Sequence, residues 1–116
     1  MINIDPQVVH DKILSVGKKW AEADGEALLL EKQKDAILAQ QIQQVISLEP
    51  GISITQAREK ALASKGYIEY IQGMCAAREK ANHAKVAYNS AQLWWEAMRT
   101  SAATLRTEMN TIGGSR

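Results

Sequence analysis

The sequence predicts an all-α protein: a long antiparallel helical hairpin of the coiled-coil type with a short connecting helix. The strongest observation is a seven-residue repeat in the C-terminal half, where fourteen successive positions spaced three and four apart are apolar. A straight helix drifts off such a stripe, so a strict repeat predicts a left-handed supercoil against a partner helix. Composition agrees, because the chain is rich in Ala and Gln and has no Phe. The stripe, called here the second seam, comprises Tyr67, Tyr70, Met74, Ala77, Ala81, Ala84, Tyr88, Ala91, Trp95, Met98, Ala102, Leu105, Met109 and Ile112.

The first helix is expected over residues 6–48. Asp5 can accept a backbone hydrogen bond as N-cap, and Pro6 suits the first helical position because its missing donor costs nothing there. The same spacing continues along it, with nine of twelve positions apolar, so the two long helices are expected to pair within the chain. This first seam comprises Val9, Ile13, Val16, Trp20, Ala23, Ala27, Leu30, Lys34, Ile37, Gln41, Gln44 and Leu48.

The connector contains both stop and start signals. Pro50 and Gly51 end the first helix, and Ser53 to Gln56 has the pattern of a capping box for a short helix over about 54–64. Ser64, Lys65 and Gly66 are expected to end it. The third helix then spans about 67–111, with residues 112–116 disordered, and residues 1–116 form one domain. Placing Leu48 near Tyr70 sets Trp20 beside Trp95 or Met98.

Charge and cysteine content limit the functional classes. Net charge is +1, but residues 1–55 carry −3 and residues 56–116 carry +4, so the halves can pair with each other or the basic half can meet an anion. The single cysteine, Cys75, forms no internal disulfide and suggests a reducing compartment. The N-terminus has no signal-peptide pattern, and no apolar run approaches membrane-spanning length. A cytoplasmic protein without a membrane partner is expected.

Nothing in the sequence predicts catalysis or a cofactor. Cys75, Glu79 and His83 share one helix face at i, i+4 spacing, which is a weak metal-like pattern that a solvated or interface face explains better. His10 lies on the other long helix. Phosphate loops and nucleophile motifs are absent. We therefore expect a non-enzymatic protein that holds no metal.

A basic series with seven-residue spacing flanks the second seam and suggests contact with nucleic acid. It comprises Arg78, Lys85, Gln92, Arg99 and Arg106. Cations at this spacing can follow a sugar-phosphate backbone. The alternative is that they pair with Glu22, Glu26 and Glu31 of the first helix or with a neighbouring subunit. The candidate nucleic-acid residues are Lys12, Lys18, Lys19, Arg99 and Arg106, with Trp94 as an off-seam tryptophan that can stack on bases or anchor an interface.

A homo-oligomer is also expected, because two helices alone leave much apolar surface uncovered. Polar residues at seam positions commonly set register and oligomeric state, although this stretch of the first helix could simply face solvent. The candidate oligomer residues are Lys34, Gln41, Gln44, Ile68, Ile71 and Cys75.

Residues 87–109 resemble the C-terminal helix of small helical proteins from tailed bacteriophages. The matching pattern is Trp94-Trp95-Glu96, then Arg99-Thr100, then Ala103-Thr104, Arg106 and Glu108. The start of the first helix, Trp20-Ala21-Glu22-Ala23-Asp24, is similar too. In plan these proteins resemble UvsY-like recombination mediators, which oligomerise, bind single-stranded DNA and help to load a recombinase.

The resemblance implies an oligomeric accessory protein of DNA recombination or replication in the bacterial host cytoplasm. Its partners would be itself, single-stranded DNA, and a recombinase or single-strand-binding protein. The alternative is a helical interaction module, an adaptor or inhibitor of a host or phage protein, without nucleic-acid binding.

Overall fold

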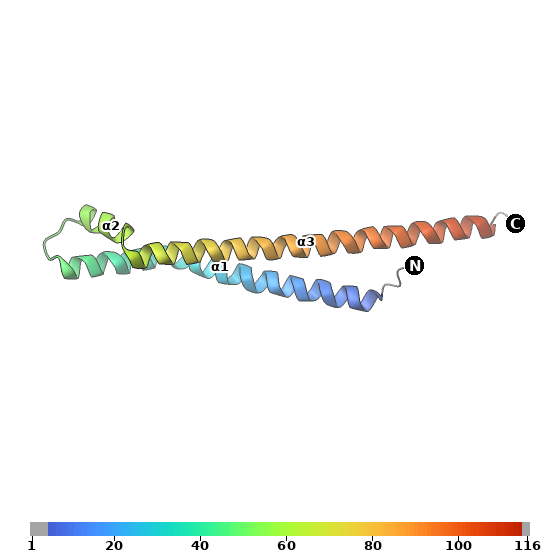
Figure 1. Ribbon diagram of the computed structural model, residues 1–116, viewed down its shortest axis with the longest axis horizontal. Coiled ribbons are helices and arrows are strands. Elements are labelled where there is room, and N and C mark those ends of the chain that lie inside the picture. The colour runs from blue at the N-terminus through green and yellow to red at the C-terminus, as the bar shows by residue number, and fades with distance from the viewer. Residues whose placement is uncertain (1–4, 115–116) are drawn as a thin grey trace. The chain divides into compact units, whose positions relative to one another are not determined.

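The structure is a computed structural model that describes residues 5–114, with side chains described to residue 110. The elements are α1 (Pro6–Leu48), α2 (Ile54–Leu62) and α3 (Lys65–Gly114), shown in Figure 1. The described residues contain no strand, so the predicted all-α class with two long helices and a short connecting helix is confirmed.

The ends of α1 and α2 follow their capping signals. Asp5 Oδ1 accepts a hydrogen bond from the Gln7 backbone N–H at 2.9 Å, which satisfies one of the donors that a helix start leaves free. At the other end Gly51 takes a φ of +93°, a left-handed conformation that glycine adopts without a Cβ clash. Ser53 Oγ then accepts from the Gln56 N–H at 3.2 Å and begins α2.

The predicted boundary near Gly66 is wrong, because α2 ends at Leu62 and α3 already begins at Lys65. Ser64 serves both helices. Its N–H and Oγ donate to the Ala61 carbonyl at the end of α2, at 3.1 and 2.7 Å, and its Oγ accepts from the Tyr67 N–H of α3 at 3.3 Å. Gly66 lies inside α3, where a Cβ would be 3.1 Å from Gln41 Nε2, so the glycine permits close approach to α1. At the far end α3 continues to Gly114, through part of the predicted disordered tail, and residues 115–116 lie outside the described residues.

The chain divides into two compact units that share the long helices. Unit 1 consists of residues 1–20 and 83–116, and unit 2 consists of residues 21–82. In unit 2, Leu30 meets Tyr70 whereas Gln41 meets Ser64, so α1 and α3 run antiparallel there, as a helical hairpin requires. In unit 1, residues 9–20 of α1 lie against residues 85–94 of α3.

The pairing register differs from the predicted one. Trp20 stacks on Tyr88 at a centroid distance of 5.3 Å, not on Trp95 or Met98. In unit 2 the Tyr70 hydroxyl donates to the Leu30 carbonyl, although the sequence placed Tyr70 near Leu48. The reason is α2, which folds back beside the last turns of α1 and takes the place of α3 there (Figure 1).

Burial follows the seams over most of their length. On α3 every second-seam residue from Tyr67 to Met98 is buried or half-buried, and Ala102, Leu105 and Met109 are exposed. On α1 the first seam holds from Val9 to Leu30. Its later members Lys34, Gln44 and Leu48 are exposed, and half-buried positions beside the seam replace them. These replacements are Leu38, Ile42, Val45 and Ile46.

The buried face of α1 shifts from the first seam to neighbouring positions because α2 packs against its end. Ala57 and Ala61 of α2 are fully buried, and Lys60 of α2 binds Glu49 at 2.5 Å, just past the end of α1. The last turns of α1 therefore pack against α2, and α1 meets the start of α3 further back, at Gln41. A helix with two neighbours needs a wider apolar stripe than a coiled-coil seam provides.

Candidate nucleic-acid interface

Arg78, the first cation of the basic series, is neutralised inside unit 2. Its Nε and Nη2 donate to the two carboxylate oxygens of Glu31 at 2.7 and 3.0 Å, and its Nη1 donates to Asp24 Oδ1 at 2.8 Å. Such a bidentate fork is among the stronger side-chain hydrogen-bonding arrangements. Hydrogen bonds from Arg78 lower the pKa of Glu31 below its ordinary 4.5. Hydrogen bonds to Glu31 and then Asp24 raise the pKa of Arg78, so it stays charged.

The internal-pairing alternative is thus correct for Arg78, with one change of partner. The sequence suggested Glu22, Glu26 and Glu31, and the structure uses Glu31 and Asp24. Asp24 and Glu31 each directly follow a first-seam residue and are seven residues apart. The seven-residue repeat therefore contained the signal that identifies Asp24.

The later cations of the series differ from Arg78. The Lys85 Nζ lies 6.0 Å from the centre of the Trp20 ring, at the outer limit of a cation–π contact. Arg99 and Arg106 are exposed, and neither forms an ion pair with any other residue in the part of the chain that the structure describes. We call Lys85, Arg99 and Arg106 the cationic flank.

The sequence of α1 explains why this pairing stops. One heptad before Asp24 the equivalent α1 position is Gly17, and one heptad earlier it is His10. Neither supplies a carboxylate, so Gly17 cannot neutralise Lys85 and His10 cannot neutralise Arg99. The equivalent position for Arg106 lies before Asp5, outside the described residues. The charge of unit 1 reflects this: its residues include seven Lys or Arg and four Asp or Glu, a net charge of +3.

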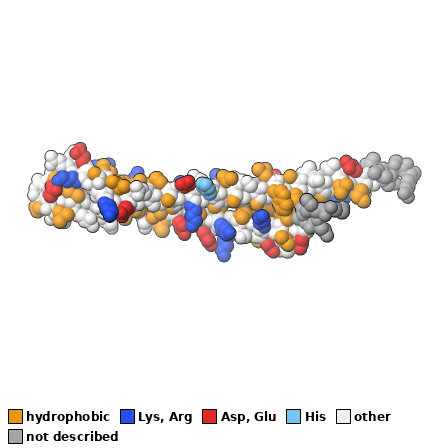
Figure 2. Space-filling model, viewed as in Figure 1, with side chains coloured by type: hydrophobic (Ala, Val, Ile, Leu, Met, Phe, Trp, Pro, Cys, Tyr) orange, Lys and Arg blue, Asp and Glu red, His pale blue; other side chains and the backbone are white. Residues whose placement is uncertain are grey.

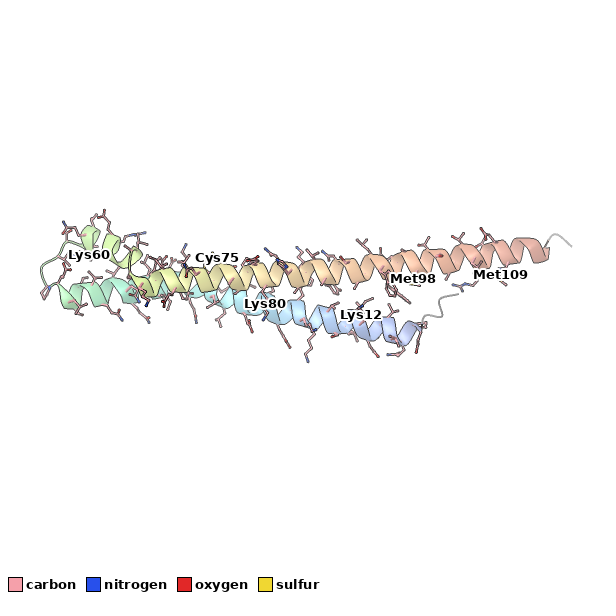
Figure 3. The ribbon with its side chains drawn as sticks, in the orientation of Figure 1. Lys12, Lys60, Cys75, Lys80, Met98 and Met109 are labelled. Atoms are coloured by element: carbon pink, nitrogen blue, oxygen red, sulfur yellow. The ribbon has the colours of Figure 1, made fainter. Side chains whose placement is uncertain are left out.

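A largely apolar groove runs between α1 and α3 in unit 1. Its volume is about 360 Å³. Trp94, 49% exposed, forms part of one wall, and Lys12 supplies a positive charge at the other. Figure 3 labels Lys12 on α1. The lining residues are Val9, Lys12, Ile13, Val16, Ala87, Ser90, Ala91 and Trp94.

The groove and the cationic flank lie on opposite sides of the second seam. Arg99 and Arg106 each directly follow a seam residue, whereas Trp94 directly precedes the seam residue Trp95. Each residue turns the helix by about 100°, so positions before and after the seam project to its two sides. Lys19 directly precedes Trp20 on α1 and belongs to the groove side in the same way.

All six residues predicted for nucleic-acid contact are exposed and belong to unit 1. The structure brings together two of them, Lys12 and Trp94, in the groove. Arg99 and Arg106 do not reach the groove. Lys18 lies two residues before the seam residue Trp20, so it projects away from α3 and from the groove. Lys85 was part of the basic series but not of the predicted set, although its spacing from Arg99 marks it as a member.

The residues predicted for oligomer contact also differ among themselves. Gln41 faces the interior of unit 2, where its Oε1 accepts from Ser64 Oγ at 3.3 Å. Ile71 is half-buried. Exposed positions in this set are Lys34, Gln44, Ile68 and Cys75.

Over the described residues, no group of three or more His, Cys, Asp or Glu side chains is arranged to hold a metal ion. None of the helices, over those residues, combines the length and apolar character needed to cross a membrane.

Comparison with known proteins gives no match to any family model, curated protein or solved structure. The candidate interface therefore depends on geometry and charge alone.

Proposed function

We propose that this chain is a non-enzymatic accessory protein of DNA recombination or replication that binds single-stranded DNA along the cationic flank. The observation that carries the proposal is the contrast within one basic series. Arg78 has two carboxylate partners, whereas Arg99 and Arg106 have none among the described residues. Cations that served only to hold the two helices together would be expected to have carboxylates opposite them.

The spacing of the flank suits an extended polyanion. Arg99 and Arg106 are one heptad apart, about 10 Å along a helix, and Lys85 lies two heptads before Arg99. Cations spaced along a helix can contact several phosphates of one strand without reading sequence. Binding is therefore expected to be independent of sequence and strongly weakened by salt. The resemblance to UvsY-like mediators adds a recombinase or single-strand-binding protein as the expected partner.

The test measures binding of fluorescent oligo-dT to the full chain by anisotropy over a series of salt concentrations. Each phosphate contact contributes about 0.7 to the slope of log affinity against log salt for single strands. Replacing Arg99 and Arg106 together by Ala is expected to reduce the slope by about 1.4.

The matched control is Arg58→Ala, which removes an exposed arginine from α2 in unit 2. It is expected to leave the slope unchanged. An absence of salt-sensitive binding at low ionic strength refutes the proposal, and so does an equal effect of Arg58→Ala.

The second candidate function is a helical interaction module that binds another protein without nucleic acid. The groove of unit 1 favours it, since apolar grooves between helices receive amphipathic helices. The DNA titration separates the two candidates, because this function predicts no binding of oligo-dT.

A further inference from the structure

The last turns of α3 form an apolar stripe without a partner in the described residues. Leu105 is 49% exposed and Met109 is 64% exposed, although both continue the seam that is covered as far as Met98. Figure 3 labels Met98 and Met109 on α3, and Figure 2 shows hydrophobic side chains exposed among the charged ones. A seven-residue repeat that persists beyond its intramolecular partner indicates a second helix.

We propose that the stripe of Ala102, Leu105 and Met109 docks into the unit 1 groove of a second copy of this chain, and that the second copy docks reciprocally. Such a two-fold interface places the two α3 helices antiparallel, with Met98 of each copy near the axis. Each copy then supplies both a stripe and a groove to the same interface, which is the requirement for a closed dimer.

Side-chain sizes fit this register. With Met98 opposite Met98, an antiparallel pairing sets Leu105 opposite Ala91 of the second copy and Met109 opposite Ala87. Both alanines line the groove and leave room for a larger side chain. Trp94, on the groove wall, falls opposite Ala102, so large residues meet small ones on either side of the Met98 pair.

Charges fit as well. Glu108 directly precedes Met109 and therefore lies on the groove side of α3. In the proposed register it meets the turn at Tyr88 of the second copy, beside the part of the groove that Lys12 lines. The cationic flank points to the opposite side and takes no part in the contact.

The expected state of the full-length chain is a dimer, measured by sedimentation equilibrium over a range of protein concentrations. Leu105→Glu introduces a charge at the middle of the docking stripe and is expected to weaken dimerisation about tenfold or more. The matched control is Leu93→Glu, the same change at a residue that is 66% exposed on α3 and absent from the groove lining. It is expected to leave the dimer unchanged. Circular dichroism establishes that both variants remain helical.

A charge exchange tests the register itself. Lys12→Glu and Glu108→Lys are each expected to weaken the dimer about two- to fivefold, as for an exposed ion pair. The double variant is expected to recover the wild-type affinity. Both residues are exposed, so neither change disturbs the interior.

Three results would overturn the proposal. A wild-type chain that stays monomeric at every concentration excludes a second copy and leaves the groove for a helix of another protein. A dimer that is insensitive to Leu105→Glu, or equally sensitive to Leu93→Glu, places the interface elsewhere. Failure of the double variant to recover affinity refutes the stated register.

Discussion

Replacing glycine by alanine at two positions of α1 tests how closely the long helices approach in unit 1. Gly25 has no atom within 4 Å of an added Cβ, so Gly25→Ala gains only helix propensity. That gain is about 1 kcal/mol in a helix interior. For a chain of this length it corresponds to an increase in Tm of about 4 °C.

The same change at Gly17 meets a side chain. Its added Cβ would lie 3.1 Å from Tyr88 Cε2, closer than about nine in ten real Cβ contacts, so the ring would have to shift by a few tenths of an ångström. The Tyr88 ring has limited freedom to move, because it packs on Trp20 and its hydroxyl accepts from Gln92 Nε2 at 2.7 Å. Overpacking typically costs about 1–3 kcal/mol, which cancels or exceeds the propensity gain.

The assay is thermal unfolding of the full chain followed by far-ultraviolet circular dichroism. Gly17→Ala is expected to melt at least about 4 °C below Gly25→Ala. In a Tyr88→Ala background the difference should disappear, because the atoms that the new Cβ meets have been removed, and the double-mutant cycle isolates that contact. Equal stabilisation by both alanines in the wild-type background would refute the idea that the Tyr88 ring limits helix approach.

Two further predictions concern unit 2. Because hydrogen bonds from Arg78 lower the pKa of Glu31, this carboxylate contributes stability that is fully present above its ordinary pKa of 4.5. That contribution is lost as pH falls through the lowered value. Glu31→Gln should therefore flatten the dependence of Tm on pH below 4.5, and an unchanged curve would contradict this. Ala81→Leu, at a residue that is 1% exposed, should cost about 1–3 kcal/mol in urea unfolding. The exposed control Ala76→Leu should cost little, and equal costs would show that Ala81 is not tightly packed.

The basic series shows which part of a candidate site a sequence pattern predicts and which part it leaves open. The seven-residue spacing identified the cations that directly follow second-seam residues. It left open whether those cations pair internally, because that depends on which α1 residues lie opposite. The contact of Arg78 with Asp24 and Glu31 fixes the register, and the α1 positions one and two heptads earlier then supply no carboxylate.

The groove is a feature that the sequence did not predict. The sequence placed the residues that line the groove in the seams or in no feature. It grouped Lys12 and Trp94 with Arg99 and Arg106, which lie on the other side of the second seam. A helical repeat specifies which residues share a face, but a groove also needs the distance and rotation between two helices.

The sequence by itself determined the helical class, the two seams and the signals that begin α1 and α2. These follow from local rules: a repeat of seven, a carboxylate or hydroxyl at a helix start, and a glycine at a turn. The tertiary structure alone decided the register of α1 against α3 and the role of Ser64 as the start of α3. Both depend on α2 folding back beside α1, a packing of segments distant in sequence that no local pattern specifies.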